Sequence, residues 1–236
     1  MTKKKEETAL AAQGPNTLAT QEPMTGEFME GIEQSDFQVP TAYTIQGTGS
    51  DQRAFPGVAI GTLVNTITKE AVASREFVVI PGGYKDWFDG REDATVMSSR
   101  SQADWPDVDT DWDARGKAGM DDPPPVYPRL NFLVLFKDEP FPIVVRFKRT
   151  SYGTGRTLNY LLGMHKGRML YTLGSREENK GKGAYLVLTI SPAGLAPADL
   201  YAAACSWATQ LAGKDLAEIA PETHEEAAET TADMPF

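Results

Sequence analysis

Two consecutive segments near the middle of the chain, LNFLVLFK (130–137) and FPIVVRFKRT (141–150), constrain the fold more than any other feature. Both are rich in β-branched and aromatic residues, and only the short acidic turn DEP separates them. This pattern predicts two adjacent antiparallel strands rather than a helix. The chain is therefore expected to be built around a β-sheet.

The second of these segments is amphipathic at the period of a strand. One face carries apolar side chains only, namely Phe141, Ile143, Val145 and Phe147. The opposite face carries Arg146 and Lys148. A buried apolar face opposite two cations suits a sheet that holds a ligand on its outer surface.

Further segments extend the sheet and add helices. Four more strands are predicted, at 57–68, 75–81, 168–175 and 183–190. Helices are predicted at 150–163 and at 196–213, the second with Pro197 in its first turn and Gly213 at its end. The stretch 82–90 is expected to be turn-rich, and 91–125 to be a long acidic loop that ends in three prolines.

The net charge of −10 conceals a strong partition along the chain. Residues 127–195 hold eleven Lys or Arg against four Asp or Glu, whereas 196–236 hold one against eight. The polar arm 1–36 and the acidic segment 214–236 have too few apolar residues to order themselves. This asymmetry favours a polyanion-binding body between disordered arms, although a chance clustering of solvated charges is the alternative.

The basic block also holds nine aromatic residues, which strengthens the polyanion interpretation. Proteins bind single-stranded nucleic acid with cations along the phosphates and rings stacked on unpaired bases. We expect most of the phenylalanines to be core, and the tyrosines and Trp87 to be the better stacking candidates.

Other chemistry finds little support in the sequence. The chain has no GxxxxGK[ST] run, and neither histidine has a metal-ligand spacing. Asp109, Asp111 and Asp113 resemble the start of a calcium loop, but Ala114 and Met120 replace the required Gly and Glu. Cys205, the single cysteine, excludes an intramolecular disulfide and fits a reducing cytoplasm. We therefore expect no catalytic residues, no metal and no cofactor.

The basic, aromatic-rich body and the acidic segment that ends in Asp-Met-Pro-Phe together resemble bacterial and phage single-stranded-DNA-binding proteins. The segments GTLVNTIT, FVVIPGGYKDWFDG and KRTSYGTGRTLNYLL resemble those of phage replication and recombination proteins. This resemblance implies an OB-like, partly open β-barrel over 37–213, with the loop 91–125 and a C-terminal helix at 197–212. It also implies a non-catalytic protein that binds single-stranded DNA largely without sequence specificity in the bacterial host cytoplasm.

The resemblance and the charge pattern give two sets of candidate site residues. The DNA-binding candidates are Tyr84, Lys85, Trp87, Arg129, Arg146, Lys148, Arg149, Tyr152, Arg156, Tyr160, Lys166, Arg168, Tyr171, Arg176, Lys180, Lys182 and Tyr185. The partner-binding candidates are Asp233, Met234, Pro235 and Phe236, which the resemblance assigns to replication or recombination proteins such as a polymerase, helicase, primase or nuclease. The acidic segment is also expected to compete with DNA for the cationic groove.

Two other functions remain open at this point. One is a phage structural or accessory protein whose acidic segments serve protein contacts. The other is a metal-dependent nucleic-acid enzyme that uses the acidic residues of 104–122. No membrane partner is expected because no apolar run approaches 18 residues, and homo-oligomerisation is left open.

Overall fold

The computed structural model describes residues 38–91, 94, 98–106, 108, 110–117, 124–165, 168–179 and 184–220. Its strands are β1 (Thr41–Thr44), β2 (Leu63–Asn65), β3 (Glu76–Asp89), β4 (Ser98–Ser99), β5 (Val126–Phe136), β6 (Ile143–Lys148), β7 (Met169–Asn179) and β8 (Ala184–Leu195). Its helices are α1 (Gly49–Ala54), α2 (Trp112–Lys117), α3 (Tyr152–Met164), α4 (Ala198–Gln210) and α5 (Leu216–Ile219), with short 3₁₀ turns η2 (Gln102–Asp104) and η3 (Arg149–Ser151).

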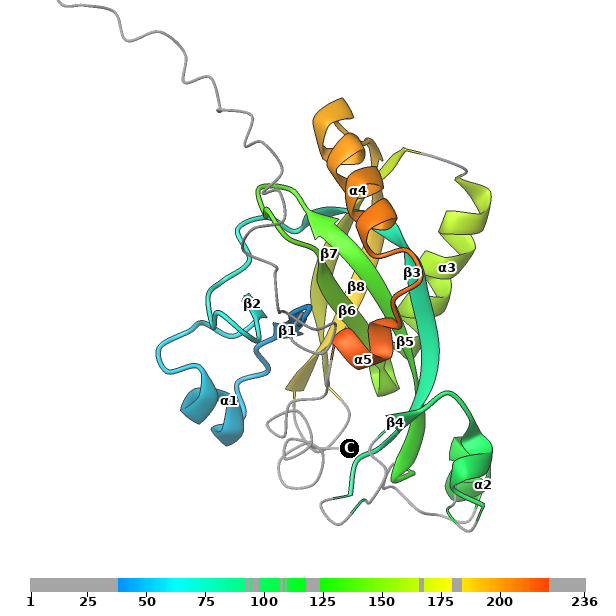
Figure 1. Cartoon of the computed structure of the whole chain (residues 1–236). Helices are drawn as coiled ribbons and strands as arrows, with labels where there is room; N and C mark the ends of the chain where they lie inside the picture. The colour runs from blue at the N-terminus through cyan, green and yellow to red at the C-terminus, as the bar shows by residue number, and fades with distance from the viewer. Residues whose placement is uncertain are drawn as a thin grey trace, which may run out of the picture.

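All these strands join one curled sheet, in the order β2-β1-β6-β5-β3-β7-β8 with β4 beside β3 (Figure 1). The neighbouring strands are antiparallel except β1 and β6, which run parallel. The predicted hairpin is therefore present as β5 and β6, with Arg129 opposite Lys148 and Val134 opposite Ile143.

The connections follow those of an OB barrel. β3, β5 and β6 form an antiparallel meander, α3 follows, and the hairpin of β7 and β8 returns so that β7 pairs with β3. A closed barrel of this type has no free strand edge. Among the described residues β6 pairs with β1 instead of β8, so the barrel is partly open, as predicted.

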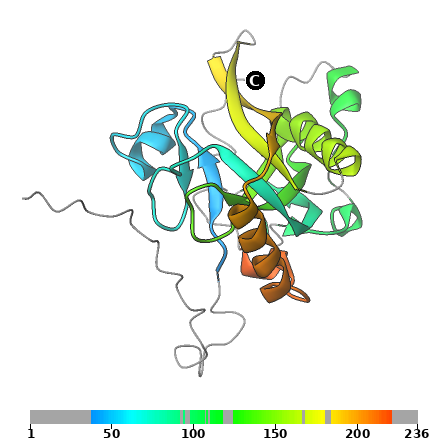
Figure 2. The same cartoon turned by 90° about the horizontal axis from the view of Figure 1, so that it is seen from above.

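Two apolar clusters hold the sheet from its two faces. The inner cluster packs Phe77, Phe132 and Phe147 against Leu158 of α3. The outer cluster packs β3, β5 and β6 against α4 and α5, with Ile219 only 1% exposed. Figure 2 shows α3 and α4 on different sides of the sheet. No helix in the described ranges combines the length and hydrophobicity needed to cross a bilayer.

The stretch predicted to be turn-rich, 82–90, is instead largely the second half of the long strand β3. Its two glycines make a bulge in the ladder with β5, between Ile80 and Tyr84. Gly82 has φ of +125°, and a Cβ on Gly83 would lie 2.8 Å from the carbonyl oxygen of Asn131. These glycines therefore bend a continuous strand rather than end it.

Other sequence predictions need smaller corrections. Of the strand predicted at 57–68, only Leu63–Asn65 is a strand. Phe141 precedes β6 and is 60% exposed, beside Trp207 of α4, so it does not share the buried face of Ile143. Residues 214–220, expected to begin a disordered arm, include the folded helix α5 with buried Leu216. The described body thus extends to Ala220.

Candidate functional site

A pocket lies where the barrel is open, between β6 and β8. β1 pairs with β6 only through Thr41 and Ala42, opposite Val144 and Val145. Beyond this short ladder the two strands diverge, and a cavity of about 100 Å³ opens between them and β8. We call this opening the seam and its cavity the seam pocket. Its lining residues are Ala42, Tyr43, Thr44, Gln46, Thr48, Tyr127, Arg146, Lys148, Arg149, Thr150, Ser151, Tyr185, Leu186 and Leu188.

Side-chain hydrogen bonds, rather than a backbone ladder, join the two sides of the seam. The backbone N–H of Leu186 donates to Oε1 of Gln46 (2.9 Å), and that of Leu188 donates to Oγ of Ser151 (3.1 Å). The hydroxyl of Thr154 donates to the carbonyl oxygen of Leu188 (2.7 Å). These bonds satisfy backbone groups on the edge of β8 that a closed barrel would pair with a strand.

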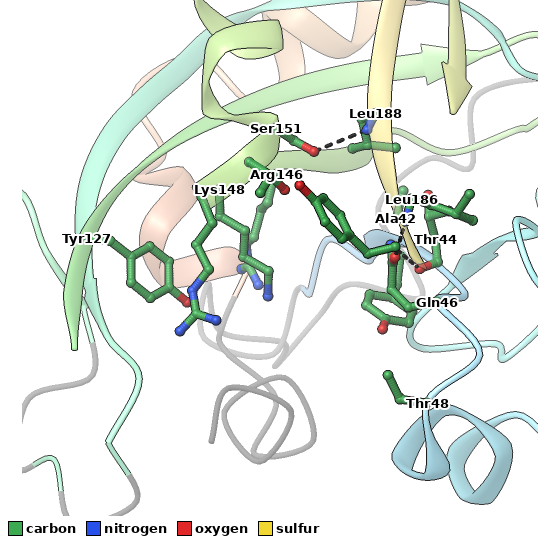
Figure 3. A pocket seen from close by; sticks show the side chains of 14 residues that line it. Ala42, Thr44, Gln46, Thr48, Tyr127, Arg146, Lys148, Ser151, Leu186 and Leu188 are labelled. Atoms are coloured by element: carbon green, nitrogen blue, oxygen red, sulfur yellow. Dashed lines mark hydrogen bonds between the residues drawn. The ribbon is translucent and has the colours of Figure 1, made fainter. Parts of the chain in front are cut away.

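Cations line one side of the seam pocket. Arg146 and Lys148 share the face of β6 opposite the inner apolar cluster, and Figure 3 shows both beside Tyr127, across from Thr44 and Gln46. Arg146 is only 6% exposed and donates to the carbonyl oxygen of Ala220 at 2.7 Å. Lys148 is half-buried at the end of the strand. The two cations that the sequence places on one face of β6 therefore line the same cavity.

Arg149 lines the same side of the pocket, and its backbone has an unusual conformation. Its φ is +49°, in the left-handed region that costs most residues about 1–3 kcal/mol. In this conformation its guanidinium carbon lies 4.6 Å from the ring centre of Tyr127. Burial lowers the pKa of Arg149, and Tyr127 partly opposes that shift. An arginine still carries its charge at neutral pH, so the pocket holds a partly desolvated cation.

Tyrosines with fixed orientations line the pocket as well. The hydroxyl of Tyr43 donates to Asp51 at 2.7 Å, and its ring stacks on Phe55 with centres 5.9 Å apart. The hydroxyl of Tyr185 donates to Glu178 at 3.2 Å. Because these contacts hold the rings before any ligand binds, stacking on them would cost little side-chain entropy.

The hydroxyl of Thr44 is a buried polar group of the pocket without a hydrogen-bond partner among the described residues. Thr44 is 6% exposed, lines the pocket, and has a hydroxyl that makes no hydrogen bond to any of them. An unpaired buried hydroxyl costs about 1–3 kcal/mol, which a ligand that bonds to it would recover. The described lining residues include no carboxylate.

The structure brings four of the predicted DNA-binding residues into the seam pocket: Arg146, Lys148, Arg149 and Tyr185. Sequence reasoning did not select Tyr43, Thr44 or Tyr127 for the site. The alternation of β1 would have given Tyr43 and Thr44 opposite faces, and nothing local shows that β1 pairs with β6. Tyr127 stood out only as one aromatic residue of the basic block.

Two predicted residues lie in the interior. Arg129 is 1% exposed, bonds to the carboxylate of Asp86, and lies over Phe88 with its guanidinium carbon 4.3 Å from the ring centre. Tyr171 is 1% exposed and packs on Phe77. Neither is placed to contact a nucleic acid, because residue type alone does not show which cations and tyrosines other elements cover.

The remaining candidates are spread over other surfaces. Lys85 lies 4.9 Å from the ring centre of Trp87 on β3, and Arg100 covers Tyr84 at 3.9 Å. Tyr152 is half-buried at the start of α3, where Arg156 and Tyr160 are exposed. Arg168 is exposed before β7, and Arg176 pairs with Glu178 at 2.6 Å. The candidates outside the described residues are Lys166, Lys180, Lys182, Asp233, Met234, Pro235 and Phe236.

The described residues include part of the acidic loop. Asp107 and Asp109 lie outside the described residues. In the part of the chain that the structure describes, no three His, Cys, Asp or Glu side chains come together as metal ligands would. The described part of the loop contributes Arg100, which pairs with Asp215 of the α5 cap at 2.7 Å.

Comparison with known proteins identifies a bacteriophage family. A family model described as Pam3 phage gp34-like protein matches residues 5–217, which is most of the chain. No curated protein and no solved structure matches it.

Proposed function

The chain belongs to the Pam3 phage gp34-like family, and we propose that it binds single-stranded DNA at the seam pocket, without catalysis and largely without sequence specificity, during phage replication or recombination. The observation that carries the proposal is the convergence of Arg146, Lys148 and Arg149 with three tyrosines at one opening of an OB-like barrel. These residues come from β1, β5, β6, η3 and β8, so their meeting depends on the fold and not on one local run of sequence.

The chemistry of the pocket suits an unpaired strand. Lys148 and Arg149 would neutralise phosphates, while the rings of Tyr43 and Tyr185 offer surfaces for bases that are not stacked in a duplex. A duplex hides the faces of its bases, so it would gain only the phosphate contacts. Preference for single strands over duplex follows from this difference.

Arg146 connects the pocket with the acidic segment that follows α5. It bonds to the carbonyl oxygen of Ala220, and the side chains of residues 221–236 include five carboxylates and no lysine or arginine. A segment tethered beside a cationic pocket reaches a high effective concentration there. We propose that residues 221–236 compete with DNA and, once displaced, offer Asp233, Met234, Pro235 and Phe236 to replication or recombination proteins in the host cytoplasm.

The first experiment compares single and double strands by fluorescence anisotropy. A labelled oligonucleotide of about 16 nucleotides is titrated with the full chain and with the double variant Lys148→Gln/Arg149→Gln. We expect single strands to bind at least about tenfold more tightly than duplex, and the variant to bind more weakly. Its salt slope should be shallower by about 0.7 for each phosphate that it no longer neutralises. Lys137→Gln is the matched control, because Lys137 is an exposed cation that pairs with Glu76 away from the pocket.

Equal affinity for both strand types, or an unchanged affinity in the double variant, would refute this assignment. A truncated chain that ends at Ala220 tests the acidic segment. Removal of residues 221–236 should tighten binding at low salt, and the gain should fade as salt screens the charges. Unchanged or weaker binding at low salt would reject the competition.

A further inference from the structure

We propose that the seam pocket accepts one pyrimidine base of the bound strand, so that thymine or cytosine is favoured over a purine at one position. This inference rests on the proposed function, since it assigns the ligand of the same site. It adds a base preference to a protein otherwise expected to bind without regard to sequence.

The size of the cavity suits a base that has a single ring. An apolar protein cavity of about 150 Å³ accommodates benzene. The seam pocket, at about 100 Å³, is smaller than that cavity but open to solvent at its mouth, so a single six-membered ring would fill it with one edge at the opening. A purine, with two fused rings, would need the pocket to widen, and the hydrogen bonds of Gln46 and Ser151 to β8 oppose widening.

The walls suit the two faces of a planar base. Leu186 and Leu188 supply apolar surface, and Tyr43 and Tyr185 supply rings whose hydroxyls are held by Asp51 and Glu178. Base stacking on aromatic side chains does not depend on the identity of the base. The walls therefore favour a base over a bare phosphate, and the volume then limits its size.

Thr44 supplies the polar contact at the edge of the base. Its hydroxyl is buried, lines the pocket and makes no hydrogen bond to the described residues. A hydroxyl both donates and accepts, so it can bond to a thymine carbonyl or accept from the cytosine amino group. Lys148 stands across the pocket from Thr44 (Figure 3), and Arg149 lines the same cavity, so both would contact the phosphate of the same nucleotide.

The experiment isolates one base from its neighbours. Strands of about 16 nucleotides carry abasic sugars everywhere except at one central position, which holds thymine, cytosine, adenine or no base. This backbone removes the stacking between adjacent bases that otherwise separates poly-dA from poly-dT. Affinities are measured by competition against a labelled natural single strand.

We expect the thymine and cytosine strands to bind about tenfold more tightly than the abasic strand, and the adenine strand to stay within about twofold of it. Thr44→Val should abolish most of that advantage. The variant removes an unpaired hydroxyl and keeps the side-chain shape, so folding should be preserved. Thr157→Val, on the exposed side of α3, is the matched control.

A second readout locates the base directly. A single 5-iodouracil at the central position should crosslink on irradiation to Tyr43 or Tyr185, identified by mass spectrometry. Adenine binding as tightly as thymine, a thymine advantage that survives Thr44→Val, or crosslinks only outside the pocket would overturn this inference while leaving single-strand binding intact. Failure of natural single strands to bind would overturn the proposed function together with it.

Discussion

Arg129 and Lys148 face each other across the ladder of β5 and β6, yet their surroundings are opposite. Arg129 is 1% exposed, bonds to Asp86 and lies over Phe88. Lys148 is half-buried at a solvent-accessible cavity whose described lining contains no carboxylate. Two cations on neighbouring strands thus have different roles, one in holding the sheet and one at a candidate binding site.

The difference shows what a charge count can and cannot reveal. Both residues contribute equally to the basic block of 127–195. A carboxylate neutralises the buried one, because an unpaired charge in the interior would be very costly. Only the charge that remains at the cavity is available to a polyanion.

The most severe test of this contrast is Arg129→Met. It leaves the carboxylate of Asp86 buried without its cation, although Asn131 still donates to that carboxylate at 2.9 Å. We expect a loss of about 3–5 kcal/mol in the free energy of unfolding, measured in urea. The double variant Asp86→Asn/Arg129→Met should recover part of this loss. A loss below about 1 kcal/mol would show that the pair is not structural.

A smaller effect is expected from α3, whose Thr154 bonds to β8 at the seam. A Cβ on Gly155 would lie 2.7 Å from Cβ of Phe147, so Gly155→Ala should push α3 away from β6. The expected loss is about 1–3 kcal/mol in thermal unfolding, together with weaker DNA binding, because Thr154 holds β8.

Gly153→Ala is the control for this helix variant. A Cβ on Gly153 meets no described atom within 4 Å, so the change should be neutral or stabilise the helix by up to about 1 kcal/mol. Equal losses of stability in the two variants would mean that the close contact between Gly155 and Phe147 does not cause the loss.

Lys148→Gln tests the second cation of the comparison, the one that lines the cavity. The free energy of unfolding should change by no more than about 0.5 kcal/mol, since the side chain is half-buried at the end of its strand. Affinity for single-stranded DNA should fall by about tenfold at low salt, with the slope against salt reduced by about 0.7. Destabilisation comparable with that of Arg129→Met would remove the distinction between the two cations.

The weakest effect is expected at Asp215, whose pair with Arg100 is about half exposed. The backbone N–H of Ala217, and then Arg100, lower the pKa of this carboxyl, although partial burial opposes them. Its charge therefore stabilises the fold above the pKa of the unfolded chain, and this contribution is lost as the pH falls through the lower folded value. Asp215→Asn should cost about 0.2–1 kcal/mol at pH 7, and the cost should disappear as the pH falls below the folded pKa, measured by urea unfolding across the acidic range. A constant difference at all pH values would show that the charge is not responsible.

Much of the fold was predictable from local pattern. The alternation of β6 and the two-strand hairpin followed from the two-residue period, because one face of that strand is buried against α3. The sequence predicts a turn at Gly82 and Gly83 where the strand has a bulge, since both features require glycine and differ only in which residues pair on either side. α5 was missed because four residues with two buried apolar side chains carry too little sequence signal.

The site was predictable only in part, for a related reason. Arg146 and Lys148 could be placed together because they share one strand face. Arg129 precedes the strand predicted at 130–137 and qualifies only as a cation of the basic block, and its contact with the distant Asp86 shows that it is buried. Tyr43 and Thr44 reach the pocket through the parallel pairing of β1 with β6, a contact between segments far apart in the chain that no local pattern specifies.

The seam also bears on how a long polymer could enter the barrel. Side-chain hydrogen bonds from Gln46, Ser151 and Thr154 join its sides near β8. Such bonds are worth about 0.5–1.5 kcal/mol each, and each can re-form by rotation of one side chain. Opening of β8 would therefore have to break these three bonds, while its ladder with β7 could stay intact, and a strand could then enter from the side. A circular or very long DNA, which offers no end to thread, could be loaded in this way.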